Sequence, residues 1–186
     1  MRNSYRLALT ISCLTVSLLI LLALYPHSSQ SFSLRESGSG TGKEAKGFTL
    51  KDLEGYDVSL SSFHGKVVLL NFWATWCPYC RKERVELNNL HEEYYGKDLV
   101  IISVAGDKSL VKVQGFIKRN PVDFIVLFDS DGEVSDSYGV RALPTNFLID
   151  REGRIIKKYS GYRKWTEPPS SEVLLDLLDS NILQKK

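Results

Sequence analysis

The sequence predicts an α/β fold in which helices flank a mixed central sheet. Two observations lead to this prediction. From residue 48 onward, apolar runs typical of buried strands alternate with segments whose apolar residues recur at helical spacing. Near the end of the chain, two strand-like runs around a tight turn and a last helix replace this alternation. With 186 residues, 43% of them hydrophobic, the chain can bury one such core.

The first half of the domain is predicted to begin with a short β-hairpin. Residues 48–50 and 57–60 are strand-like and flank a turn-like stretch, KDLEGY. Residues 66–74, KVVLLNFWA, form a continuous apolar run, as expected for a central strand covered on both faces. Residues 78–95 have apolar side chains at roughly helical spacing and stop at a glycine, so they predict a helix. The side chains at this spacing are Val85, Leu87, Leu90 and Tyr94.

The second half continues the alternation of strands and helices. A buried strand is predicted at 99–106 and a helix at 109–119, which an Asn-Pro pair ends. The next predicted elements are a strand at 123–129, a short helix at 133–139, and strands at 145–150 and 154–160 joined by an Arg-Glu-Gly turn. After Glu-Pro-Pro, Ser170 or Ser171 can cap a last helix over residues 172–183.

The charge distribution argues against a polyanion-binding surface. The formal net charge is +2, but the first 43 residues hold four basic residues and one acidic residue. The remainder therefore holds 20 basic and 21 acidic residues. The sequence has no basic stripe interleaved with aromatic residues, so nucleic acid is not an expected partner.

Residues 1–25 are predicted to be a membrane anchor. Within them, residues 7–25 are nineteen uncharged residues, and only two arginines are charged before them. This segment nearly spans a bilayer core of about 30 Å, whereas the apolar part of a cleaved signal, the alternative, is about 7 to 15 residues long. Cys13 lies inside the run and is interpreted as a small apolar residue. The positive-inside tendency places the rest of the chain on the extracytoplasmic side.

Residues 26–47 are predicted to be a flexible linker. They contain six serines and four glycines in 22 positions and no apolar period. A random coil of this length reaches roughly 25 Å. The folded domain, predicted over residues 48–183, is therefore expected to stay near the membrane.

Two cysteines mark the candidate active site. Cys77 and Cys80 lie where a buried strand ends and a helix begins. Backbone N–H groups and the helix dipole favour a thiolate there, and Pro78 fits a first helical turn because that turn needs no N–H from it. We expect Cys77 to be exposed at the helix tip and to attack a disulfide. Cys80, one turn inward, is expected to resolve the mixed disulfide.

Other roles for the two cysteines have less support. A zinc site needs two further Cys or His ligands, but the third cysteine lies in the N-terminal apolar run and only His64 and His91 lie in the domain. Two core thiols would not explain the Trp-Cys-Pro sequence around the first cysteine. We therefore expect no metal and no other bound cofactor.

Two separated motifs, NFWATWCPYC and ALPTNFLID, are similar to those of the thioredoxin superfamily. With the anchor, the hairpin and the sequence CRKE, they resemble its membrane-tethered extracytoplasmic branch, the TlpA/ResA-like thiol-disulfide oxidoreductases linked to cytochrome c maturation. The resemblance covers about residues 47–180 and implies a thioredoxin-like fold. It also implies that Pro144 is cis and faces the cysteines, that the Leu143 backbone pairs with an extended substrate segment, and that Trp76 flanks the substrate groove.

Glu83 is the acid next to the cysteines. It lies three residues beyond Cys80 and so on the same helix face, where a carboxylate can accept the proton of the resolving thiol. The alternative is a solvated side chain that pairs with neighbouring arginines. The resemblance favours the functional role, because the related branch has a functional glutamate at this position of CRKE.

Three features depart from the family pattern. The buried aspartate of thioredoxins is Asn71 here, and a proline that commonly kinks the active-site helix is Val85. Pro78 and Tyr79 match the dipeptide of glutaredoxins, which are less reducing than thioredoxin. These two residues are therefore expected to tune the redox potential.

The resemblance implies a protein-disulfide reductase whose substrates are disulfide-containing extracytoplasmic proteins, apocytochrome c among them. Electrons would come from a membrane thiol-transfer protein fed by cytosolic thioredoxin. A disulfide-forming oxidase of the same fold would use the same residues in the opposite direction. A copper-binding chaperone is a third alternative, but it resembles CxxxC with a distal histidine, and no histidine follows His91 here.

Overall fold

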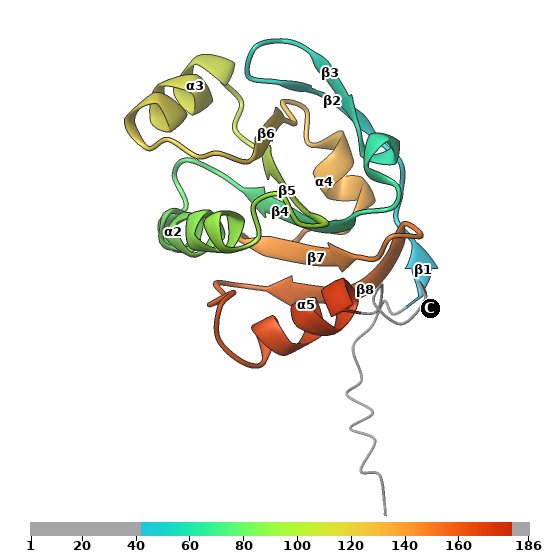
Figure 1. Cartoon of the computed structure of the whole chain (residues 1–186). Coiled ribbons are helices and arrows are strands. Elements are labelled where there is room, and N and C mark those ends of the chain that lie inside the picture. The colour runs from blue at the N-terminus through green and yellow to red at the C-terminus, as the bar shows by residue number, and fades with distance from the viewer. Residues whose placement is uncertain (1–41, 180–186) are drawn as a thin grey trace, which may run out of the picture. The chain divides into compact units, whose positions relative to one another are not determined.

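The computed structural model describes residues 42–179. Within this range an eight-stranded sheet, in the strand order β1-β8-β7-β4-β5-β6-β2-β3, has helices on both faces (Figure 1). The sheet contains both parallel and antiparallel neighbours. The predicted α/β fold with a mixed sheet is therefore confirmed.

The centre of the sheet is the apolar strand β4 (Val67–Trp73), all seven residues of which are buried. It pairs in parallel with β5 (Leu99–Ala105) and antiparallel with β7 (Thr145–Ile149). Because both faces of the sheet are covered, a polar side chain on β4 must find its hydrogen-bond partners inside the protein. Asn71, which is 2% exposed, is such a side chain.

The outer strands extend the sheet on both sides of this centre. β6 (Ile125–Phe128) adds a parallel strand to β5, and β8 (Arg154–Ser160) adds an antiparallel strand to β7. β2 (Thr49–Asp52) and β3 (Asp57–Ser59) form the predicted N-terminal hairpin. The hairpin lies at one edge of the sheet because β2 pairs antiparallel with β6.

Helices divide between the two faces of the sheet. α2 (Pro78–Glu93), α3 (Leu110–Arg119) and α5 (Ser170–Asp179) contribute apolar side chains to one core cluster. α4 (Glu133–Ser137) and the 3-10 helix η1 (Leu60–Phe63) pack with the hairpin on the other face. The crossovers β4-α2-β5 and β5-α3-β6 run in the same direction along the sheet, so their right-handed connections place α2 and α3 on one face. This arrangement brings α3 next to the start of α2.

The core-facing stripe of α2 differs from the prediction. Leu87 and Leu90 are buried as expected, but Val85 is 51% exposed. The buried stripe instead passes through Cys80 and Glu83. Glu83 lies three residues after Cys80 and four residues before Leu87, which is the spacing of one helix face. A charged side chain therefore occupies a place in the core that the prediction gave to valine.

Two short elements were not predicted. β1 (Lys43–Glu44) pairs with β8 and lies within the range expected to be linker. η1 follows the hairpin directly. β1 and η1 are very short, so their sequences have no period to detect.

The last helix was predicted, but its start differs. α5 begins at Ser170 itself rather than after a serine cap.

The predicted anchor at residues 1–25 lies outside the described residues, and so do residues 26–41 of the predicted linker. Between residues 42 and 179, no helix combines the length and the apolar character that crossing a membrane requires.

Candidate active site

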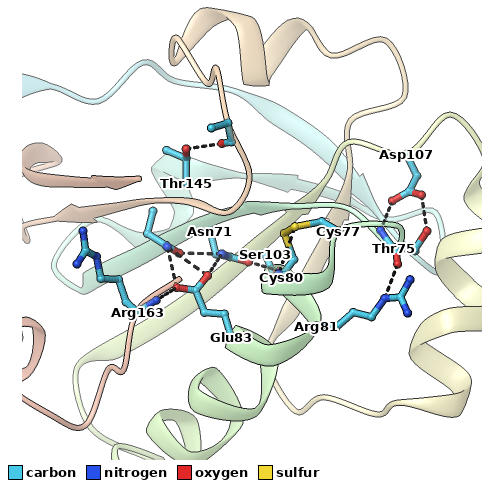
Figure 2. Close-up of a disulfide and its surroundings, with 12 residues drawn as sticks. Asn71, Thr75, Cys77, Cys80, Arg81, Glu83, Ser103, Asp107, Thr145 and Arg163 are labelled. Carbon is cyan, nitrogen blue, oxygen red and sulfur yellow. Dashed lines mark hydrogen bonds between the residues drawn. A yellow bond between two sulfur atoms is a disulfide. The ribbon is translucent and has the colours of Figure 1, made fainter. Parts of the chain in front are cut away.

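The two cysteines lie where the central strand passes into α2. Cys77 is the N-cap residue of α2 and Pro78 is its first residue, as the sequence predicts. Cys77 and Cys80 form a disulfide, and their Cα atoms are 5.3 Å apart (Figure 2). The backbone N–H of Cys80 donates a hydrogen bond to Cys77 Sγ at 3.2 Å. The sulfur of Cys77 therefore lies against an N–H group that the helix itself leaves without a partner.

Cys77 is less accessible than expected. The prediction placed it at the surface, but Cys77 and Cys80 are both 4% exposed. The reason is geometric, because the Cys77 sulfur bends back over the first turn of α2 to reach Cys80. The exposed side chains are instead the neighbouring aromatic residues, Trp76 and Tyr79, each 65% exposed.

The loop before Cys77 is held by an aspartate that the sequence analysis did not identify. Asp107, directly after β5, is 4% exposed and accepts hydrogen bonds from Thr75 N at 2.9 Å and Thr75 Oγ1 at 2.6 Å. Arg81 Nε donates to Thr75 O at 2.9 Å, so the same loop is tied to α2. Figure 2 shows these contacts on the side of the disulfide away from Glu83. The available signal was the Gly-Asp pair that ends the apolar run of β5.

The second motif adopts the backbone conformation implied by the resemblance. The Leu143–Pro144 peptide bond is cis. Pro144 is buried, and the partly buried Leu143 packs against the cluster that contains both cysteines. Pro144 O accepts a hydrogen bond from Gly161 N at 2.8 Å, which fixes the segment to the end of β8. The structure thus contains the cis bond at Pro144, and the place of Leu143 and Pro144 in substrate binding stays a prediction.

Glu83 is buried at 1% exposure and its carboxylate is surrounded by hydrogen-bond donors. Interpreting it as a solvated side chain is therefore wrong. The donors are Asn146 Nδ2 at 3.0 Å, Asn71 Nδ2 at 3.2 Å, the backbone N–H of Arg163 at 2.9 Å and Trp165 Nε1 at 3.3 Å. Figure 2 shows the carboxylate of Glu83 directed at Asn71.

Asn71, the position that departs from the family pattern, connects Glu83 to the rest of the core. Its amide nitrogen also donates to Asn146 Oδ1 at 2.7 Å, and its oxygen accepts from Ser103 Oγ at 3.0 Å. Asn71, Ser103 and Cys80 line one small cavity of about 10 Å³. Sequence analysis noted Asn71 but gave it no role, and it missed Asn146, which is a polar residue in an apolar strand.

The burial of Glu83 changes its acidity. Removal from water raises the pKa of Glu83 from 4.5 to about 7, although hydrogen bonds from Asn146, Arg163 and Trp165 oppose the rise. A carboxyl group with a pKa near 7 can both release and accept a proton under ordinary conditions. It lies one helical turn from Cys80, so this capacity is next to the inner cysteine.

The described residues offer no obvious place for a metal ion. Between residues 42 and 179, no cluster of three or more His, Cys, Asp or Glu side chains has a geometry that could hold one. The site as described contains the two sulfur atoms and the buried carboxyl group of Glu83.

Comparisons with known proteins agree with this geometry. The Redoxin family model matches residues 40–175. The thiol-disulfide oxidoreductase ResA of Bacillus thuringiensis subsp. konkukian is 41% identical over 132 residues, which cover 71% of this chain and 76% of that protein. ResA of Bacillus subtilis is 37% identical over 147 residues, which cover 78% and 82%.

Solved structures show the same relationship. A protein of Chlorobium tepidum assigned as the thiol:disulfide interchange protein DsbE has a TM-score of 0.70 and 33% identity, and the match covers 74% of this chain and 97% of that one. StoA of Bacillus subtilis has a TM-score of 0.58 and 30% identity, with 66% and 98% covered. The chain therefore belongs to the redoxin family, and within it to the thioredoxin-like thiol-disulfide oxidoreductases related to ResA.

Proposed function

We propose that this protein reduces disulfides of extracytoplasmic proteins, with Cys77 as the attacking residue and Cys80 as the resolving residue. The observation that carries the proposal is the Cys77–Cys80 disulfide at the start of α2, with the Cys80 N–H on the Cys77 sulfur. In the reduced protein that N–H and the helix dipole would stabilise a Cys77 thiolate. Pro78 has no backbone N–H, and the first turn of a helix needs none from it.

The reaction transfers two electrons in two exchanges. The Cys77 thiolate attacks one sulfur of the substrate disulfide, and the other substrate sulfur leaves as a thiolate that takes up a proton. The Cys80 thiolate then attacks Cys77 Sγ in the mixed disulfide. This step forms the Cys77–Cys80 disulfide and releases the second substrate thiol.

Glu83 is proposed to accept the proton of Cys80. A thiol that is 4% exposed resists ionisation, so the resolving step needs a nearby base. Glu83 is on the same face of α2, and its pKa of about 7 leaves a substantial carboxylate fraction at neutral pH. The hydrogen bonds from Asn71 and Asn146 keep the carboxylate in place while its charge changes.

Substrate contacts are proposed for residues around the disulfide. Trp76 is exposed beside Cys77, where it can cover a bound segment. The partly buried Leu143 precedes the cis proline, and its backbone is proposed to pair with an extended substrate strand. Pro144 would hold that backbone at the disulfide. Pro78 and Tyr79, between the cysteines, are proposed to tune the redox potential.

The proposed location is supported by the sequence of the N-terminus, and the proposed partners are supported by the family. The apolar segment within residues 1–25 supports a membrane anchor, residues 26–47 a tether, and the arginines before the apolar segment an extracytoplasmic domain. Relatives at about 40% identity are named ResA. Apocytochrome c is accordingly a proposed substrate, and a membrane thiol-transfer protein is the proposed electron donor. The oxidase of the same fold remains the main alternative.

The redox potential separates reductase from oxidase. We expect the Cys77/Cys80 couple to lie between about −270 mV, as in thioredoxin, and about −200 mV, as in glutaredoxins. Equilibration with a thiol redox buffer, followed by alkylation of both cysteines, measures this value. A potential close to about −120 mV would identify a disulfide-forming oxidase instead.

The role of Glu83 predicts a change in the pH dependence of exchange. Glu83→Gln should slow disulfide exchange by at least about tenfold and remove the rise in rate as Glu83 ionises near pH 7. Stopped-flow rates between pH 5 and 9 test this, with Glu92→Gln on the exposed side of α2 as the control. Alkylation of Cys77 should be retained. Superimposable rate profiles for Glu83→Gln and the parent would exclude the proposed role.

The raised pKa also predicts how stability depends on pH. At Glu83 the folded protein binds more protons than the unfolded chain between pH 4.5 and about 7. This contribution to the free energy of unfolding is complete below pH 4.5 and is lost as the pH rises through 7, by roughly 3 kcal/mol. Urea unfolding of the oxidised protein at several pH values should show this decrease in the parent and in Glu92→Gln. An equal decrease in Glu83→Gln would assign it to other groups.

An uncleaved anchor predicts membrane retention. The full-length protein should stay in the membrane fraction after washing with high salt and with carbonate, because these agents do not extract a spanning helix. Protease added on the extracytoplasmic side should release a fragment that begins in the linker. Recovery of a soluble form beginning near Phe32 would show that the segment is a cleaved signal.

A further inference from the structure

A groove lies beside the disulfide, on the side opposite Glu83. It has a volume of about 630 Å³ and runs between the loop before α2 and the helix α3. Its lining includes Thr75, Arg81, Val111, Lys112, Phe116 and Arg119. None of the residues proposed above to bind substrate forms this lining, so the groove is a separate surface.

The groove is strongly cationic. Arg81, Lys112 and Arg119 line it, and no acidic residue does. Within residues 42–179, none of these three side chains forms an ion pair. The nearby carboxylate of Asp107 is buried and already accepts two hydrogen bonds from Thr75. The three cations of the groove therefore have no direct ion-pair partner among the described residues.

One of these cations is held in place by a hydrogen bond to the backbone. Arg81 Nε is bound to Thr75 O, which fixes the guanidinium at the start of α2. The guanidinium of Arg119 reaches back one turn along α3, where its Nη1 would lie 3.5 Å from a Cβ on Gly115. Because Gly115 has no side chain, the Arg119 side chain can lie over this turn of α3. A fixed cation such as Arg81 loses less side-chain freedom on binding an anion than a free one does.

The groove is next to the reacting sulfur atoms. Thr75 is two residues before Cys77, and Arg81 follows Cys80 directly. Figure 2 shows Thr75 and Arg81 together on one side of the disulfide. Apolar surface borders the charges, because Val111 is 76% exposed and Phe116 is partly buried. A chain that is joined to Cys77 through a mixed disulfide would extend across this surface within a few residues, at about 3.3 Å per residue.

We propose that the groove binds an acidic segment of the partner protein, a few residues from the partner cysteine that reacts with Cys77. The proposal rests on the proposed function and adds a preference among substrates. Three unpaired cations fit clustered carboxylates, and the apolar border fits a polypeptide better than a small ion. Charges near the surface act mainly on encounter, so the preference should appear in the association rate and should weaken with salt.

The test compares three peptides that have one cysteine in a disulfide with thionitrobenzoate. Three residues beside the cysteine are all Glu, all Gln or all Lys. The full-length protein in detergent, reduced beforehand, should react with the Glu peptide on the order of tenfold faster than with the Gln peptide at low salt, and more slowly with the Lys peptide. The Glu/Gln ratio should approach one at about 1 M salt.

Two charge-matched variants locate the effect. Lys112→Gln with Arg119→Gln should bring the Glu/Gln ratio close to one at low salt. Lys43→Gln with Lys46→Gln removes the same charge at the far edge of the sheet and should leave the ratio unchanged. Equal effects of the two double variants would overturn the proposal, because they would show a response to net charge alone.

Further outcomes separate the two proposals. If the reduced protein exchanges with none of the peptides, the proposed function fails. If it exchanges with all three at one rate, the groove has no role while the function stands. If oxidised glutathione, a small anionic disulfide, reacts as fast as the Glu peptide and loses this rate in Lys112→Gln with Arg119→Gln, the groove serves small anions and the polypeptide partner is excluded.

Discussion

The burial of the Glu83 carboxylate is the interaction on which the arrangement of the site depends. Glu83 is on α2, and its hydrogen-bond donors come from β4, from β7 and from the segment at 163–165 that leads to α5. A buried carboxylate without such partners would cost several kcal/mol. These four parts of the chain must therefore keep one position relative to one another. The start of α2, with both cysteines, is held by the same requirement.

The disulfide separates two electrostatic environments. On the inner side, Glu83 lies among amide and N–H groups in a region of low dielectric, where burial has a large effect on proton affinity. On the outer side, Arg81, Lys112 and Arg119 face an open groove where solvent and salt screen their charges. Burial thus suits the inner side to proton transfer in the proposed reaction. Exposure suits the outer side to selecting a partner as it approaches.

The candidate site shows how far sequence reasoning could reach. Cys77, Cys80 and Glu83 follow one another at intervals of three residues in the chain, so helical spacing alone places them along one side of α2. The donors to Glu83 could not be found in this way, because Asn146 and Trp165 are 63 and 82 residues away. The burial of Cys77 was also mispredicted, since exposure depends on how the sulfur bends and on what packs over the helix start. Asp107, like Asn146, was missed because its hydrogen-bond partner, Thr75, is distant in the sequence.

The sequence by itself determined the order and type of the main elements and the position of the cysteine pair at a helix start. Alternation of apolar residues, turn residues and the strand-to-helix junction are local properties, and each is readable within a few positions. Only the tertiary structure decided the strand order, the attachment of the hairpin to β6 and the short strand β1. It also decided that Glu83 rather than Val85 enters the core, and that α3 forms a cationic groove beside the disulfide. These features depend on contacts between distant segments, and the free energy of such contacts is set by packing and burial that no local pattern encodes.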